Sequence, residues 1–87
     1  MKMLKDPQAT LDYSVEWSQW LDGDTISTSS WTVTTGLNNT SESTTTTKAT
    51  VWLSGGSIGG VYSAVNTITT ATGRTDERTI TITVVNK

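Results

Sequence analysis

Residues 50–70 read TVWLSGGSIGGVYSAVNTITT, and residues 79–85 close the chain with TITITVV. Two pairs of glycines divide the first stretch into two short apolar runs, and the second stretch alternates strictly between polar and apolar side chains. A period of two is typical of a strand that buries one face and exposes the other. The C-terminal half therefore predicts three strands, separated by a glycine turn and by a hairpin loop at residues 71–76.

The N-terminal half continues this pattern. Alternating apolar residues predict a strand that ends at Trp17, and Asp22-Gly23-Asp24 is a turn signal. Ile26 and Trp31 differ in parity, which predicts a β-bulge within residues 27–30. The predicted strands cover residues 13–17, 26–33, 49–53, 61–70 and 79–85, with one short edge strand within residues 37–47.

Length and composition favour a single small all-β domain. The chain has 87 residues, threonine makes up roughly a quarter of them, and tryptophan occurs four times. We therefore predict an immunoglobulin-like antiparallel β-sandwich over residues 9–87, preceded by an extended N-terminal segment, residues 1–8, with no helix longer than a turn or two. Its predicted core consists of Leu11, Tyr13, Val15, Trp17, Ile26, Val33, Val51, Leu53, Ile80, Ile82 and Val84.

The composition also narrows the class of function. The chain has no cysteine and no histidine, which removes disulfides, thiol nucleophiles, zinc sites and histidine bases. Its net charge of −2 lacks the basic footprint of a nucleic-acid-binding protein. The first residues are too quickly charged for a signal peptide, and no stretch is long enough to span a bilayer. We predict no catalytic residue, cofactor or metal, and no membrane partner, for a protein made in a cytoplasm.

Two loops resemble ligand sites but fit turns better. Asp22 and Asp24 provide too few oxygens for a recognisable calcium loop, so a structural turn is favoured. The glycines of residues 55–60 lack the Lys-Ser/Thr and the following helix of a phosphate-binding loop. Tyr62 follows this loop at the start of a late strand, which is typical of a tyrosine corner, with simple core burial as the alternative.

Possible partner contacts come from residues that the domain does not obviously use. Trp17 is expected in the core, and of the other three tryptophans we expect at least one at an interface between subunits. The N-terminal segment has apolar residues without a periodicity that places them in the core, and chain ends are normally disordered unless they are tied down. The hairpin tip projects, although a solvated tip with local ion pairs is the simpler interpretation. The candidate partner-binding residues are Met3, Leu4, Trp20, Trp31, Trp52, Arg74 and Asp76.

The sequence as a whole resembles a known family. The features that carry the resemblance are Lys5-Asp6-Pro7, Leu11-Asp12-Tyr13, Glu16-Trp17-Ser18, Trp20-Leu21, Gly23-Asp24-Thr25-Ile26, Trp31-Thr32-Val33, Gly36-Leu37, Val51-Trp52-Leu53-Ser54-Gly55-Gly56, Tyr62, Asn66, Ile68-Thr69-Thr70, Gly73-Arg74 and the Ile80/Ile82/Val84 strand. The pattern is similar to the fiber-tail adaptor family of tailed bacteriophages. The only departure is at Glu16, where aspartate is more usual in the family.

This resemblance implies a non-enzymatic virion structural protein. It implies an adaptor, present in several copies in a symmetric particle, that attaches fibres to the tail or neck and contacts other phage structural proteins. Three alternatives remain at this point. One is a capsid decoration or connector-associated protein, and another is a carbohydrate-binding module with Trp20, Trp31 or Trp52 as its aromatic platform. The third is a small hydrolase, which the missing nucleophile and base disfavour.

Overall fold

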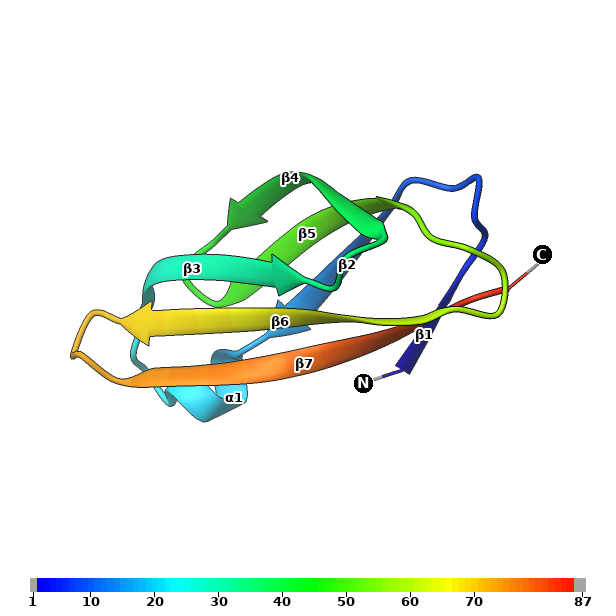
Figure 1. Cartoon of the computed structure of the whole chain (residues 1–87). Coiled ribbons are helices and arrows are strands. Elements are labelled where there is room, and N and C mark those ends of the chain that lie inside the picture. Colours follow the sequence, from blue (N-terminus) through cyan, green and yellow to red (C-terminus); the bar gives the residue numbers. More distant parts are fainter. Residues whose placement is uncertain (1, 86–87) are drawn as a thin grey trace.

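The computed structural model describes residues 2–85, which form seven strands and one short helix (Figure 1). The elements are β1 (Lys2–Lys5), β2 (Leu11–Glu16), α1 (Ser18–Leu21), β3 (Ile26–Val33), β4 (Leu37–Thr44), β5 (Lys48–Gly55), β6 (Val61–Thr70) and β7 (Thr75–Val84). The all-β prediction is confirmed, and β2 to β7 lie close to the predicted segments, although β7 begins four residues before its predicted position. β1 is an additional strand, in the segment that the sequence places outside the sandwich.

The strands form two sheets that pack face to face. One sheet has the order β1-β7-β6-β3 and the other the order β2-β5-β4. All pairs are antiparallel except β1 and β7, which run parallel. The strand order is consistent with an immunoglobulin-like sandwich, in which the third, sixth and seventh strands share one sheet and the second, fourth and fifth the other.

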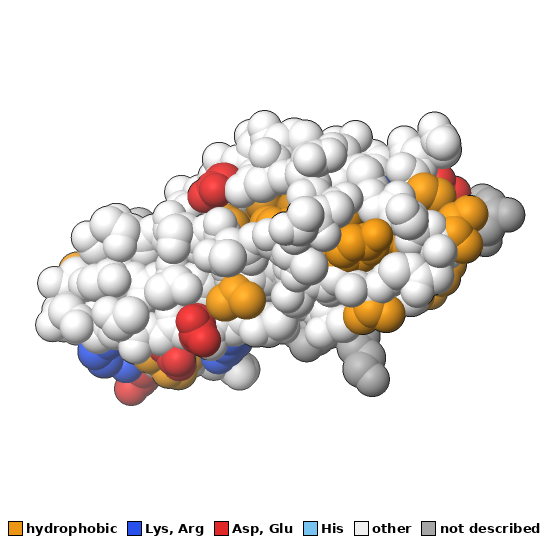
Figure 2. Space-filling model, in the orientation of Figure 1, with side chains coloured by type: hydrophobic (Ala, Val, Ile, Leu, Met, Phe, Trp, Pro, Cys, Tyr) orange, Lys and Arg blue, Asp and Glu red, His pale blue; other side chains and the backbone are white. Residues whose placement is uncertain are grey.

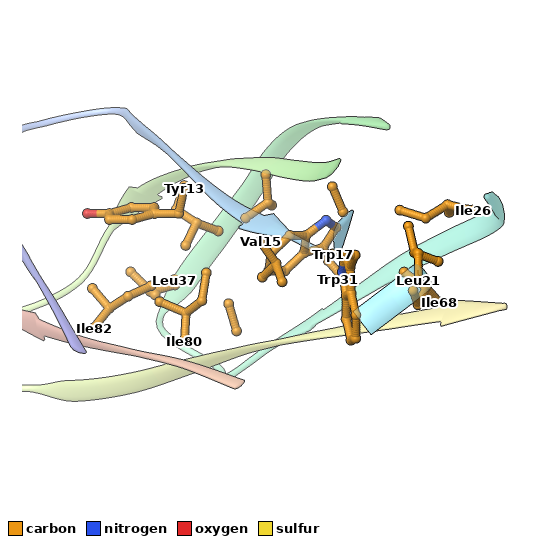
Figure 3. Packing of buried hydrophobic residues seen from close by; sticks show 14 residues of the cluster. Tyr13, Val15, Trp17, Leu21, Ile26, Trp31, Leu37, Ile68, Ile80 and Ile82 are labelled. Atoms are coloured by element: carbon orange, nitrogen blue, oxygen red, sulfur yellow. The ribbon is translucent and has the colours of Figure 1, made fainter. Parts of the chain in front are cut away.

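The hydrophobic core lies between the two sheets and runs along the molecule (Figure 3). Of the predicted core residues, nine are buried, but Leu11 is 38% exposed and Val33 is only partly buried. Leu11 has the inward parity of Tyr13, but it is the first residue of β2 and lies at the end of the sheet. Residues buried in the cluster beyond the prediction are Leu21, Trp31, Leu37, Ala49, Ala64 and Ile68.

A β-bulge and an edge strand both lie within the residue ranges predicted for them. The pairing of β3 with β6 shifts register between Ile26 and Thr28, so that Ser27 is the extra residue of a bulge. This bulge returns Trp31 and Ile26 to the same buried face. The threonine-rich segment after Gly36 forms β4, an edge strand of which only Leu37 is buried. The edge-strand prediction is therefore confirmed.

The N-terminal segment takes part in the fold to an extent that the sequence does not indicate. β1 pairs with β7 along its whole length, and Met3 packs against the core. The expectation that Met3 has no place in the domain's own core is therefore wrong, because pairing with β7 turns this side chain inward. Lys5 is fully buried, and its ammonium group donates hydrogen bonds to the carbonyl oxygens of Asp6, at 2.9 Å, and Gly55, at 2.7 Å. Lys5 thus ties β1 to the end of β5 in the opposite sheet, and its burial lowers the pKa of the amine.

Tyr62 holds the connection between β5 and β6. Its hydroxyl accepts a hydrogen bond from the backbone N–H of Ser57 at 2.9 Å, the bond to upstream backbone that the predicted tyrosine corner requires. The ring fits only because glycines surround it: a Cβ at Gly36 or Gly60 would lie 2.8 or 2.7 Å from its atoms. The residue is partly rather than mostly buried, since it lies near the end of the sandwich. The glycine-rich loop over residues 56–60 is a turn, as predicted.

Candidate docking surfaces

At one end of the molecule, Arg74 joins the β6–β7 turn to α1. Its Nε lies 3.2 Å from Asp24 Oδ2, and its Nη2 donates to the carbonyl oxygen of Leu21 at 2.7 Å. The guanidinium carbon lies 4.4 Å from the centre of the Trp20 ring. Arg74 therefore satisfies a helix carbonyl, a carboxylate and an aromatic face at once. The expectation of ion pairs local to the hairpin tip is wrong for Arg74, whose partner comes from the turn after α1.

A second arginine extends this arrangement along the sandwich. Trp20 meets Trp17 edge to face with 5.3 Å between ring centres, and Arg78 lies 4.4 Å from the centre of the Trp17 ring. The Trp17 Nε1 donates to Asn66 Oδ1 at 2.9 Å, deep in the core. We name Arg74, Trp20, Trp17 and Arg78 the arginine–tryptophan stack. Its polar and aromatic groups are paired with one another.

In the turn after α1, the carboxylate of Asp24 is surrounded by hydrogen-bond donors. Asp24 accepts a hydrogen bond from the Thr72 hydroxyl at 2.6 Å, and this bond, with others from the Thr25 backbone and from Arg74, holds the pKa of its carboxyl well below the usual range. Asp22–Asp24 is a turn, as favoured from the sequence, and Asp22 adopts a left-handed conformation with φ of 48°. Among residues 2–85, no three acidic side chains converge as a metal site. The Asp24 carboxylate holds the hairpin through Thr72 and Arg74.

The opposite end of the molecule exposes apolar side chains. Leu4 is 56% exposed, and Ile58 and Val61 are each 63% exposed. Leu4 and Val61 both pair with Thr83, from the two sides of β7, so they point outward on the same face. The loop that carries Ile58 is hydrogen-bonded to Val84 through Gly59 and Gly60. We name Leu4, Ile58 and Val61 the terminal patch.

The space-filling view agrees with this contrast between a charged end and an apolar end. Figure 2 shows hydrophobic side chains toward the end of the molecule that the β5–β6 loop reaches, and lysine and arginine side chains near the β6–β7 turn. Exposed apolar side chains that form a contiguous patch often mark a site of contact with another protein. The terminal patch is therefore a candidate contact surface, whereas the arginine–tryptophan stack is engaged within the chain.

The third surface is the outer face of the smaller sheet, where Trp52 lies on the central strand β5. Its side chain is 41% exposed, and it stands between Asp12 of β2 and Ser41 of β4 in the pairing register. Val51 and Leu53, on either side of it in the sequence, are fully buried. Trp52 therefore stays a candidate for the subunit contact that is expected of at least one of Trp20, Trp31 and Trp52.

The structure separates the residues predicted to bind partners. Trp20 and Arg74 lie in contact, and Met3 and Leu4 point to opposite sides of β1. Trp31 is 8% exposed in the core, and its buried Nε1 has no hydrogen-bond partner among residues 2–85. Asp76 is exposed near the start of β7, where its carboxylate accepts from the backbone N–H of Glu77.

Two members of the terminal patch were not among the residues predicted to bind partners. Ile58 lies among glycines in a turn and Val61 at the outward-facing start of a strand. Apolar residues in those positions are the signal that would have indicated them. The pairing of Arg74 with Asp24 had no such signal, since fifty residues separate the two in the sequence.

These features define a small structural β-sandwich whose free surfaces are suited to contacts. Among residues 2–85, no helix is long and apolar enough to cross a membrane. The family model described as "Podophage GP4 fiber-tail adaptor protein gp77" matches residues 5–83, and the chain belongs to this phage fiber-tail adaptor family. No curated protein matches it. The family resemblance stated from the sequence is confirmed.

Proposed function

We propose that this protein is a non-enzymatic adaptor subunit that attaches fibres to the tail or neck of a tailed-phage virion, in several copies around a symmetric particle. The observation that carries the proposal is the family match, which includes nearly the whole sandwich, from Lys5 to Thr83. A role in the virion tail also accords with a rigid module that carries uncovered apolar side chains at one end.

Within this function, the terminal patch is the surface that docks against neighbouring phage structural proteins. Burying a leucine, isoleucine or valine side chain contributes roughly 1.5–3 kcal/mol. The patch contains Leu4, which was singled out in the N-terminal segment, and adds Ile58 from the projecting loop. Docking there keeps β1 paired with β7, so the subunit enters the particle already folded.

Other candidate residues have lesser roles in this proposal. Met3 supports the patch from inside the sandwich, and Trp20 and Arg74 stabilise the far end. Asp76 is exposed there and offers a secondary polar contact. The adaptor is made in the host cytoplasm, and it uses neither nucleic acid nor a membrane.

Phage complementation tests the proposal. Virions are produced with the triple variant Leu4→Ser, Ile58→Ser, Val61→Ser in place of the natural protein. The expected result is that the purified variant melts like the natural protein but is depleted at least about tenfold from virions, since each apolar contact is lost. A deletion of residues 1–7 is not suitable, because it removes β1 and the buried Lys5.

The matched control is Val65→Ser. Val65 belongs to the same strand as Val61 and points to the same outer face, but it lies opposite Thr79, away from the patch. Val65→Ser should be incorporated normally. Normal incorporation of the triple variant would contradict docking through the terminal patch, and detection of the natural protein on isolated capsids but not on tails would contradict the adaptor role.

A further inference from the structure

The surroundings of Trp52 differ from those of the other three tryptophans. Trp17, Trp20 and Trp31 pack into the core or against it, whereas Trp52 stands on the outer face of the smaller sheet. No other large apolar side chain of the central strand β5 faces outward, since Ala49, Val51 and Leu53 are all buried. An aromatic ring is thus presented alone on a sheet face, with its position fixed by a strand paired on both sides.

The neighbours of the ring are small and polar. Asp12 and Ser41 lie directly across from Trp52 on the two adjacent strands, where side chains are typically about 4.5–5.5 Å apart at Cβ. Ser54 follows two residues later on the same side of β5, and Asn38 pairs with it. The ring is therefore bordered by a carboxylate, hydroxyls and an amide.

These polar groups are not engaged by other groups among residues 2–85. Within residues 2–85, the side chains of Trp52, Asp12, Ser41, Ser54 and Asn38 make no hydrogen bond. Hydroxyls elsewhere on the sheets bond each other, as Ser14 does with Thr50 at 2.9 Å and Thr34 with Ser63 at 2.9 Å. Donors and acceptors around Trp52 thus remain free for an external ligand.

A ligand that fits this surface has a flat face of C–H groups and hydroxyls around its rim. A pyranose ring has both: its C–H groups carry partial positive charge and stack on the electron-rich face of an indole, and its hydroxyls bond carboxylates and amides. A protein partner suits the surface less well, because protein interfaces usually have a cluster of apolar anchors at their centre, and here the single anchor has polar neighbours.

We propose that Trp52, with Asp12 and Ser41 at its border, forms a binding site for a saccharide chain. The indole face stacks against one pyranose ring, and the Asp12 carboxylate accepts hydrogen bonds from its hydroxyls. The site lies on the outer face of the smaller sheet, whereas the terminal patch lies on β1 and β6 of the larger sheet and on the loop between β5 and β6. Saccharide binding is therefore independent of the adaptor role.

Nuclear magnetic resonance titration tests the site directly. The ¹⁵N-labelled full-length protein is titrated with cellohexaose, maltohexaose and hexa-N-acetylchitohexaose, up to about 10 mM, a range that detects millimolar affinities. The indole N–H signals are assigned with Trp→Phe variants. For at least one oligosaccharide we expect a saturable shift of the Trp52 signal, with the signals of Trp17 and Trp31 unchanged.

Three variants sharpen the result. Trp52→Ala should weaken binding at least about tenfold, and Asp12→Asn, which keeps the shape and removes the charge, should weaken it several-fold. Ile58→Ser removes an exposed apolar side chain of the terminal patch and should bind normally. The absence of a saturable shift with all three sugars would overturn the proposal, as would unchanged binding by a folded Trp52→Ala variant. Loss of virion incorporation by Trp52→Ala without any saccharide binding would assign the ring to a protein contact and equally overturn it.

Discussion

The two ends of the sandwich differ in whether their side chains are paired within the chain or left exposed. At the β6–β7 turn, arginines, tryptophans and Asp24 pair with one another, so that the hairpin and α1 hold together through contacts within the chain. At the end with the β5–β6 loop, Lys5 and Tyr62 are similarly engaged, but Leu4, Ile58 and Val61 project without cover. Residues of the first kind stabilise the fold, and residues of the second kind are available to a partner.

The largest effect should come from the arginine–tryptophan stack. Trp17→Ala removes a ring that is fully buried, together with its bond to Asn66, and should lower the free energy of unfolding by about 3–5 kcal/mol. The matched variant Trp52→Ala makes the same exchange at an exposed site and should cost less than about 1 kcal/mol. Urea denaturation measures both, and similar costs would show that the assignment of the two tryptophans is mistaken.

A second pair contrasts isoleucines near the terminal patch. Ile82 is fully buried on β7, and Ile82→Ala should cost about 2–5 kcal/mol through lost transfer energy and the cavity that remains. Ile58→Ala should change stability by no more than about 0.5 kcal/mol, because this side chain is mostly exposed. A shift below about 0.5 kcal/mol for Ile82→Ala would mean that the wrong face of β7 has been placed inward.

A smaller effect is expected at the corner formed by Tyr62. Tyr62→Phe keeps the ring between Gly36 and Gly60 but removes the acceptor for the Ser57 N–H, which should cost about 1 kcal/mol. Chemical denaturation of the two proteins measures the difference. Equal stability would indicate that only the packing of the ring matters.

The smallest expected effect is the contribution of Asp24 to stability, which should be visible through its dependence on pH. Because the folded state lowers the pKa of Asp24, its stabilisation is complete above the unfolded value of about 4 and declines as the pH falls below it. The difference in unfolding free energy between the natural protein and Asp24→Asn should therefore narrow between about pH 5 and pH 2. Other carboxylates titrate in both proteins and largely cancel. A difference that stays constant over this range would contradict the assigned pKa.

Local patterning explains why most strands could be predicted. The alternation of Ile80, Ile82 and Val84 fixes the inward face of β7, and the same argument for Val51 and Leu53 places Trp52 outside. The parity slip between Ile26 and Trp31 similarly predicts the bulge at Ser27. In each case the information lies within a few residues of the sequence.

What could not be predicted depends on distant parts of the chain. β1 is only four residues long, and its parallel pairing with β7 brings together opposite ends of the sequence. Burial of Lys5 follows from that pairing, and a lysine is rarely expected inside. The link between Arg74 and Asp24 likewise depends on how the hairpin meets α1. Among the exposed contact residues, Leu4 and Trp52 were predicted from the sequence. Ile58 and Val61 join Leu4 in the terminal patch only through the fold.

A cryo-electron microscopy reconstruction of the virion most directly tests whether the uncovered end is the docking end. We expect copies of this sandwich at the tail or neck, with Leu4, Ile58 and Val61 buried against a neighbouring subunit and the β6–β7 turn not serving as the main attachment. A reconstruction in which the terminal patch faces solvent while the arginine–tryptophan stack is buried against the partner would contradict it.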